Sequence, residues 1–307
     1  MSPINPNLIL CGVLLIIATA LMISVQDLVF KLFTGELTLW QIFSLRGIMA
    51  VPVLVAICFA STRSITSVRL AFTLWPLFRA LCITMTFLAF YAAIPFLSLS
   101  TVGAANYTAP IFVAILSAYV IKEPVGLWGW IGVALGFLGV VILLQPGTDA
   151  FSVFSLLPIA GAAFYSIGHI ITRTHCQGIA TEVLSLSQNT TMLFVGVLIS
   201  AALLFFSPDN TASREFPYLL GQWSTVGIKD WMVLALLAVF AIVLGIMLAR
   251  AYQIAPPATI ATFEYSYLIF VAGWDILFFG LPPTVPTLIG IIFIVGAGLI
   301  VMQSRSN

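Results

Sequence analysis

Several ionisable side chains fall inside long apolar runs of the sequence, where a charge is costly. They are Asp27, Arg46, Arg79, His169, Glu264 and Asp275. On membrane-insertion scales a charge at the centre of a spanning helix costs about 2.5–3.5 kcal/mol, so each group needs a partner or a water-filled cavity. The carboxyl group of Glu264 could take up a proton or bind a cationic solute; the alternative is a neutral carboxyl held in helix packing. His169 could relay protons, because histidine changes its charge near neutral pH, or could simply bond to backbone.

The other members of this set have more ordinary interpretations as well. Arg46 could bind a substrate carboxylate through two parallel hydrogen bonds, or it could neutralise Asp27. Arg79 falls near the end of an apolar run, so we expect its side chain to extend towards water. Proton coupling is assigned to Glu264, His169 and Asp27.

Two of the apolar stretches copy one another. Residues 93–114, AIPFLSLSTVGAANYTAPIFVA, align without a gap with residues 251–272, AYQIAPPATIATFEYSYLIFVA. Tyr107 and Tyr265 are one of the identical pairs at an offset of 158, and Asn106 and Glu264 stand at the neighbouring equivalent positions. Duplicated membrane units of this kind are how transporters build two halves around one site.

The duplication extends over the rest of the chain. Upstream, an offset of 142 aligns pairs of polar residues: Lys31 with Arg173, Asp27 with His169, and Arg46 with Gln188. Polar groups thus recur at the same places in both halves. Equivalent helices that line a cavity from two sides would have this pattern, with Asp27 and Arg46 near one mouth and His169 and Glu264 near the other.

Tyrosines inside the apolar runs suit an amphipathic organic solute better than a bare ion, because a buried tyrosine usually has a hydrogen-bond partner. Contact of a cationic amine with their rings would give the same pattern as ordinary packing. Trp40, near the end of a run, is either an interface anchor or a cavity residue. The predicted substrate-binding set is Asn106, Tyr107, Glu264, Tyr265, Arg46, Trp40, Tyr91, Tyr165 and His169.

The elements that carry these residues are membrane-spanning helices. With 62% apolar residues, 7% charged residues and a mean hydropathy of +1.18, the chain cannot be buried in one water-soluble core. Apolar runs near the ~20 residues that a bilayer requires predict ten spans. They are roughly 8–30, 38–60, 71–94, 98–120, 126–145, 153–173, 182–206, 231–252, 258–280 and 285–303.

The predicted fold is an all-α integral membrane protein with ten transmembrane helices. Each half contributes five spans, an odd number, so the second half lies upside down relative to the first and forms a five-plus-five inverted repeat. The first half of the repeat is residues 1–147. The second half is residues 148–307 and has a longer outer loop at residues 207–230.

Charge and cysteine usage exclude several classes of function. A net charge of +1 with scattered basic residues argues against nucleic acid as a partner. The cysteines lack CxxC spacing, so we predict neither a disulfide framework nor a metal site. No motif for nucleotide hydrolysis, a cofactor or a catalytic nucleophile is present. The expected partners are a small-molecule substrate and membrane lipid, with the protein as a monomer or homodimer.

The basic residues predict the orientation in the membrane. A cytoplasmic N-terminus places six basic residues at the inner ends of spans: Arg63, Arg69, Lys122, Arg173, Arg250 and Arg305. The outer ends then carry Lys31, Arg214 and Lys229. This positive-inside bias predicts a multi-pass protein of a bacterial inner membrane with both termini in the cytoplasm.

Two short motifs are typical of a known superfamily. One is Ser44-Leu45-Arg46-Gly47 in the second span, and the other runs from Tyr91 through Ala109-Pro110-Ile111-Phe112 to Lys122-Glu123-Pro124. With them, the chain resembles the drug/metabolite transporter superfamily over essentially its whole length, and within it the EamA-type ten-helix carriers. The second half departs from the pattern, with Leu268 where Pro110 stands and Leu281 where Glu123 stands.

The resemblance implies a secondary transporter that moves a small organic metabolite by alternating access. The expected substrate is an amino acid or a related amphipathic or cationic solute, which the protein exports or exchanges. Glu264 is the residue that would couple this transport to protons. The alternatives are an uptake carrier for a nutrient or nucleoside-like compound, and a non-transporting membrane receptor or assembly protein. An intramembrane enzyme is disfavoured, because His169 and Glu264 lack a third ligand or a nucleophile.

Overall fold

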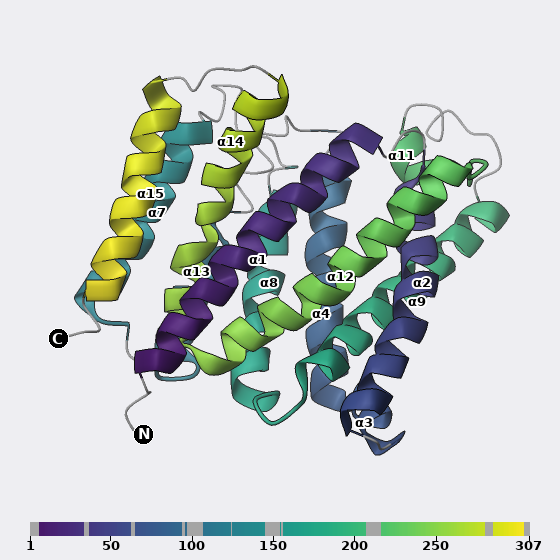
Figure 1. Cartoon of the computed structure of the whole chain (residues 1–307), viewed down its shortest axis with the longest axis horizontal. Coiled ribbons are helices and arrows are strands. Elements are labelled where there is room, and N and C mark those ends of the chain that lie inside the picture. Colours follow the sequence, from purple (N-terminus) through teal and green to yellow (C-terminus); the bar gives the residue numbers. More distant parts are fainter. Residues whose placement is uncertain are drawn as a thin grey trace. The chain divides into compact units, whose positions relative to one another are not determined.

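The structure is a computed structural model of the 307-residue chain. It describes residues 6–33, 37–62, 65–93, 96, 107–123, 125–144, 154, 156–206, 216–279 and 285–303, and every regular element in these ranges is a helix (Figure 1). The helices are α1 (Pro6–Phe33), α2 (Leu39–Thr62), α3 (Ile65–Leu70), α4 (Leu74–Ala93), α6 (Ala109–Tyr119), α7 (Leu127–Leu144), α8 (Leu156–His175), α9 (Thr181–Phe206), α11 (Pro217–Leu220), α12 (Ile228–Ile254), α13 (Pro257–Glu264), α14 (Ser266–Phe279) and α15 (Val285–Gln303).

Length and composition identify membrane spans among these helices. Within the described residues, six stretches are long and apolar enough to cross a bilayer: Asn7–Val29, Leu39–Ser61, Leu74–Ala93, Thr181–Phe205, Ile228–Ile254 and Pro257–Phe278. Three shorter apolar helices lie at Ala109–Tyr119, Leu127–Ile142 and Leu288–Val301. The all-helical membrane class is therefore confirmed, whereas the count of ten spans stays a prediction.

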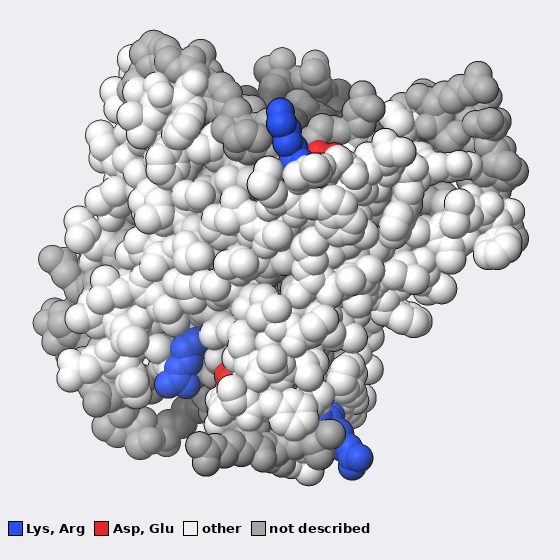
Figure 2. Space-filling model, turned by 45° about the vertical axis from the view of Figure 1, so that its right-hand side comes forward, with Lys and Arg blue, Asp and Glu red and all other residues white. Residues whose placement is uncertain are grey.

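Large apolar side chains on the outside of the helices support the same class. Phe205 is 81% exposed and Ile228 is 83% exposed, a state that suits lipid better than water. Figure 2 shows one face of the molecule on which Lys, Arg, Asp and Glu are few and most of the visible surface is uncharged.

The chain forms two compact units. Unit 1 comprises Met1–Ser24, Met85–Gly178 and Met247–Asn307, and unit 2 comprises Val25–Thr84 and Ile179–Ile246. Each unit takes helices from both predicted halves of the sequence. Three helices, α1, α4 and α12, contribute residues to both units.

In unit 1, α7 packs along α15, and α13 packs against α6. One of its apolar clusters joins Val140 of α7, Ile294 of α15 and Leu268 of α14 around the ring of Tyr265. The contact between α7 and α15 is close at Gly139, since a Cβ built there would lie 2.8 Å from the carbonyl oxygen of Gly290. Small residues allow such close backbone approach between membrane helices.

In unit 2, α2 packs along α9, and α3 adds to this pair. Buried apolar side chains of α2, α9 and α12, with Ala71 directly after α3, share one cluster: Ala50, Leu54, Cys58, Ala71, Val183, Leu186, Ala238 and Ile242. The side chain of Gln41, at the start of α2, is fully buried, and its amide donates a hydrogen bond of 2.7 Å to the carbonyl of Ser224. A polar side chain inside the unit is thus satisfied by backbone.

The contact of α7 with α15 predicts a position-specific effect on stability. Gly139→Ala should lower the thermal midpoint by several degrees, because overpacking at a backbone contact costs about 1–3 kcal/mol. Gly296→Ala on α15 is the matched control, since nothing lies within 4 Å of a Cβ at that position. Thermal unfolding of the purified variants in detergent measures both. Equal midpoints for the two variants would contradict the packing described for α7 and α15.

Candidate functional site

A carboxyl group inside unit 1 is held by two tyrosines. The hydroxyl of Tyr165 on α8 donates a hydrogen bond of 2.7 Å to Oε1 of Glu264, and the hydroxyl of Tyr252 on α12 donates one of 2.8 Å to the same oxygen. Glu264 is the last residue of α13 and lies within the candidate span Pro257–Phe278. Three helices therefore meet at one carboxylate oxygen, within a stretch that is long and apolar enough to cross a bilayer.

The ring of His169 packs against the rings of both tyrosines. Its ring centroid lies 4.0 Å from that of Tyr252 at an interplanar angle of 20°, a stacked arrangement. The centroid of Tyr165 lies 4.2 Å from it at 60°. His169 is fully buried. The two tyrosines thus contact both ionisable groups, and we refer to Tyr165, His169, Tyr252 and Glu264 as the carboxylate cluster.

Local sequence explains how these side chains meet. Tyr165 and His169 are four residues apart on α8, and this spacing places them on one face of the helix. Tyr252 and Glu264 lie on either side of the Pro256-Pro257 pair, where α12 ends and α13 begins. Proline cannot donate the hydrogen bond that would continue α12, so the chain turns there and brings α13 back beside the end of α12.

The helix that carries Glu264 is interrupted directly after it. The residue between α13 and α14 is Tyr265, whose carbonyl accepts a short-range hydrogen bond from the amide of Leu268 (3.1 Å). Tyr265 is fully buried, and its hydroxyl lies 3.5 Å from the carbonyl oxygen of Tyr107, to which it donates. Interrupted helices at membrane depth occur where backbone is enclosed by protein or lines a cavity, and they are frequent at transporter binding sites.

The chemistry available at this site comes from one oxygen and several ring faces. Both tyrosine hydroxyls donate to Oε1, and Oε2 of Glu264 accepts no hydrogen bond from the part of the chain that the structure describes. The residue is partly exposed. Its carboxylate can therefore accept a proton or a hydrogen bond from a cationic group, while aromatic rings nearby offer stacking and cation–π contacts.

The structure places the other predicted site residues as follows. Tyr107 packs beside Tyr265, the residue that follows Glu264, with their ring centroids 6.1 Å apart. Tyr91 contacts Phe87 and Phe90 of its own helix, with ring centroids 6.4 and 5.5 Å away. Asn106 lies outside the described residues.

Three predicted residues belong to unit 2. Arg46 has Nη2 3.5 Å from the sulfur of Met192 and its guanidinium 5.7 Å from the ring centroid of Phe43. Asp27 is exposed on α1. The interpretation that these two side chains pair near one mouth of a cavity stays a prediction.

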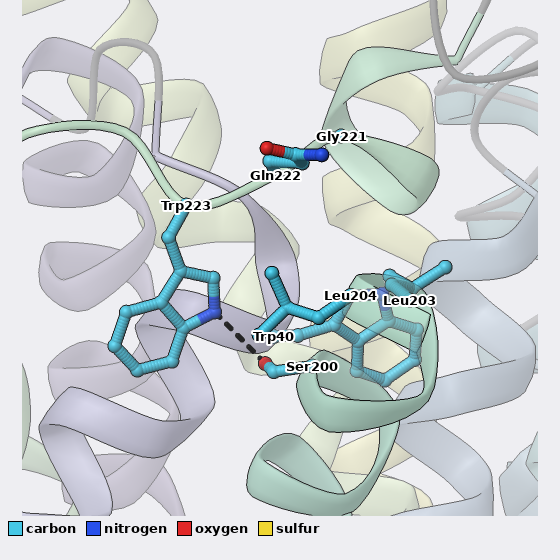
Figure 3. A pocket seen from close by; sticks show the side chains of 7 residues that line it. All are labelled: Trp40, Ser200, Leu203, Leu204, Gly221, Gln222 and Trp223. Carbon is cyan, nitrogen blue, oxygen red and sulfur yellow. Dashed lines mark hydrogen bonds between the residues drawn. The ribbon is translucent and has the colours of Figure 1, made fainter. Parts of the chain in front are cut away.

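Trp40 lies in a small hollow of unit 2 (Figure 3). The hollow is lined by Trp40, Ser200, Leu203, Leu204, Gly221, Gln222 and Trp223. The indole nitrogen of Trp40 donates to the carbonyl of Leu219 (2.6 Å), and that of Trp223 donates to the hydroxyl of Ser200 (2.9 Å). Both indoles are thus fixed by hydrogen bonds at the start of α2 and the end of α9, as suits tryptophans that anchor a helix end.

One expectation needs correction, and one residue of the carboxylate cluster was not predicted. Arg79 does not extend towards water: it is fully buried in unit 2, and its Nη1 lies 3.4 Å from both the carbonyl of Leu184 and the side-chain oxygen of Gln188 on α9. Tyr252 was not among the predicted site residues, because it stands at the very end of its apolar run. Its place within the duplicated stretch, four residues before Pro256, was the available signal.

Helices long and apolar enough to cross a bilayer, one of which carries the buried carboxylate cluster, identify the chain as an integral membrane protein. Residues 10–145 match the EamA-like transporter family, which confirms the resemblance to the drug/metabolite transporter superfamily. A crystal structure that is 15% identical superposes with a TM-score of 0.77 over 97% of this chain and 99% of that one, and it shows a shared fold only.

Curated relatives with transport functions match parts of the chain. A riboflavin transporter of Vibrio cholerae is 26% identical over 57% of this chain, and an S-adenosylmethionine uptake transporter of Rickettsia prowazekii is 23% identical over 68% of it. These matches span 53% and 64% of the relatives' own lengths, less than two thirds in both cases. A riboflavin transporter of Brucella anthropi is 26% identical over 67% of this chain and 68% of its own.

The shared oxygen of Glu264 predicts energetic coupling between it and the tyrosines. Tyr165→Phe and Tyr252→Phe should each lower the free energy of unfolding by about 1–2 kcal/mol, because each removes a hydrogen bond to Oε1 of Glu264. In a Glu264→Leu background the acceptor is already lost, so the same changes should cost much less. Unfolding by SDS titration in mixed micelles measures this cycle. Tyr119→Phe, at a residue that is 76% exposed, is the control, and costs that simply add would show that the hydroxyls do not depend on Glu264.

Proposed function

We propose that this protein is a secondary transporter that takes up a small organic metabolite carrying a flat aromatic heterocycle or a positive charge. The observation that carries the proposal is the carboxylate cluster, where one oxygen of Glu264 is held by two tyrosines and the other is left for a ligand. Aromatic rings and a carboxylate recognise such a solute by stacking, cation–π contact and a charge-assisted hydrogen bond.

The choice of substrate class rests on both the site and the relatives. Riboflavin contains a flat, conjugated ring system, and S-adenosylmethionine combines an adenine ring with a positively charged sulfonium. Both compounds suit a site built from tyrosines, histidine and a carboxylate. The relatives give no support to the export or exchange that the resemblance favoured, whereas the alternative of an uptake carrier fits the name of the Rickettsia protein.

Alternating access in this proposal uses a five-plus-five inverted repeat. Helix boundaries support it, because they recur at the two offsets found in the sequence. Offset 142 relates the ends of α1 and α8, at Phe33 and His175, and the starts of α2 and α9, at Leu39 and Thr181; offset 158 relates the starts of α7 and α15, at Leu127 and Val285. Equivalent helices also pack on each other within each unit, α7 on α15 and α2 on α9.

The energy for transport would come from a gradient, since the sequence has no motif for nucleotide hydrolysis. Glu264 is the group in the carboxylate cluster that could exchange a proton for a cationic solute. The residues assigned to coupling are therefore Glu264 and His169 in the cluster, with Asp27 as a further candidate on α1. A bacterial inner membrane with both termini in the cytoplasm is the proposed location, from the distribution of basic residues.

A transport assay with the relatives' solutes tests this function. Purified protein in proteoliposomes should accumulate labelled riboflavin or S-adenosylmethionine, or a metabolite found by thermal-shift screening, in which a ligand of the folded state raises the melting temperature. Glu264→Gln should reduce uptake at least about tenfold and remove any stimulation by an inward proton gradient, because the amide cannot ionise. Glu182→Gln, at a partly exposed glutamate in the first turn of α9, is the control and should transport like the parent.

The outcomes separate the parts of this proposal. Proton stimulation that persists in Glu264→Gln would remove Glu264 from the coupling step. Efflux from loaded vesicles without uptake would favour export. Absence of binding and of movement for every solute on the panel would favour the non-transporting alternative.

A further inference from the structure

A second polar cluster in unit 1 joins the ends of three helices. The guanidinium of Arg173, in the last turn of α8, contacts Oε1 of Glu123 through both Nε and Nη2, each at 2.9 Å. Its Nη1 donates a hydrogen bond of 2.7 Å to the carbonyl oxygen of Gln253, near the end of α12. Arg173 thus connects three segments: α8, which carries it, the turn that follows α6, and the end of α12. We call Arg173, Glu123 and Gln253 the clasp.

The clasp is enclosed by protein. The side chains of Arg173 and Glu123 are 10% and 13% exposed, and Gln253 is 6% exposed. The amide of Gln253 in turn donates a hydrogen bond of 2.7 Å to the carbonyl of Cys176, a fully buried cysteine that forms no disulfide. Helix C-termini leave backbone carbonyls without a partner in the helix, and a cation is favourable beside them. From the last turn of α8, Arg173 therefore satisfies the carboxylate of Glu123 and one carbonyl near the end of α12.

The clasp is also built so that it can be broken. Both contacts of Arg173 with Glu123 fall on Oε1, and Oε2 of Glu123 is buried with no hydrogen-bond partner among the described residues. The residue before it, Lys122, has a φ of 56°, in the left-handed region that a residue with a side chain rarely adopts. A buried carboxylate with one oxygen that lacks a hydrogen bond, next to a residue with a strained backbone, does not suit a contact that must stay closed permanently.

The duplication shows that only one end of the repeat has this pair. The offsets that relate the halves place Lys31 opposite Arg173, but Leu281 opposite Glu123 and Pro95 opposite Gln253. Neither leucine nor proline can supply the carboxylate or the side-chain amide of the clasp. The two ends of the carrier thus differ in their chemistry, and the clasp lies at the end that the positive-inside pattern assigns to the cytoplasm.

We propose that the clasp is a reversible gate: its ion pair holds the ends of α6, α8 and α12 together when this end of unit 1 is closed, and it breaks when this end opens. The proposal rests on the proposed transport function for its purpose, because alternating access requires each end to open in turn. The physical claim itself concerns only the making and breaking of the contacts of Arg173.

Native Cys176 reports on the gate without any substrate. In the full-length protein with Cys11, Cys58 and Cys82 replaced by alanine, reconstituted in lipid nanodiscs, the rate of reaction of Cys176 with N-ethylmaleimide measures how often its surroundings open. Glu123→Gln and Arg173→Gln should each raise this rate at least about tenfold, because either change removes the ion pair. Exchanging the two residues, Glu123→Arg with Arg173→Glu, should bring the rate back towards that of the parent.

The controls separate a gate from a structural tie. Arg250→Gln changes an exposed arginine near the end of α12 and should leave the rate unchanged. Thermal midpoints of all variants are compared, since faster labelling with an unchanged midpoint means local opening rather than unfolding. An unchanged rate in both single variants, or a rise explained by a fall in the midpoint, overturns the gate. Transport that fails in proteoliposomes while labelling responds would overturn the proposed function and leave the gate standing.

Discussion

The carboxyl group of Glu264 inside an apolar stretch is the constraint on which the rest of unit 1 depends. A membrane interior offers no water to this group, so protein must supply its hydrogen bonds. Tyr165 and Tyr252 do so from two different helices. Because both hydroxyls meet on one oxygen, α8 and α12 must approach the end of α13 at the same depth. The packing of three helices is thereby tied to the position of one side chain.

Helix interruptions make that arrangement possible. A continuous helix from Ile228 to Phe279 would carry Tyr252 and Glu264 more than three turns apart along one axis. The Pro256-Pro257 pair ends α12 and starts α13, and the second interruption at Tyr265 separates α13 from α14. Backbone groups released at these points stay within the protein, where Tyr265 itself is fully buried. The sequence therefore uses two breaks in apolar helices to build one polar cluster.

Much of this site could be predicted from the sequence because an ionisable residue in an apolar run is conspicuous. Glu264 and His169 were found on that ground, and Tyr165 and Tyr265 because tyrosines are polar at one end. Tyr252 was missed because it stands at the end of its run, and its role depends on a chain reversal that hydropathy does not encode. Arg79 was placed near water because it lies near the end of a run, whereas tertiary packing against α9 buries it. The pairing of Glu123 with Arg173 joins residues 50 positions apart and is set by packing that periodicity cannot predict.

The two polar clusters of unit 1 share the same helices. Tyr165, His169 and Arg173 follow one another at intervals of four residues along one face of α8, so the site and the clasp occupy the same stripe. On α12, Tyr252 bonds to Glu264 while the carbonyl of the next residue, Gln253, accepts from Arg173. A movement of α8 away from the end of α12 would therefore stretch contacts in both clusters together. If the clasp is the gate, a solute that separates His169 from Tyr252 acts directly on it, and occupancy of the site and opening of this end are coupled through two rigid helices rather than through a distant relay.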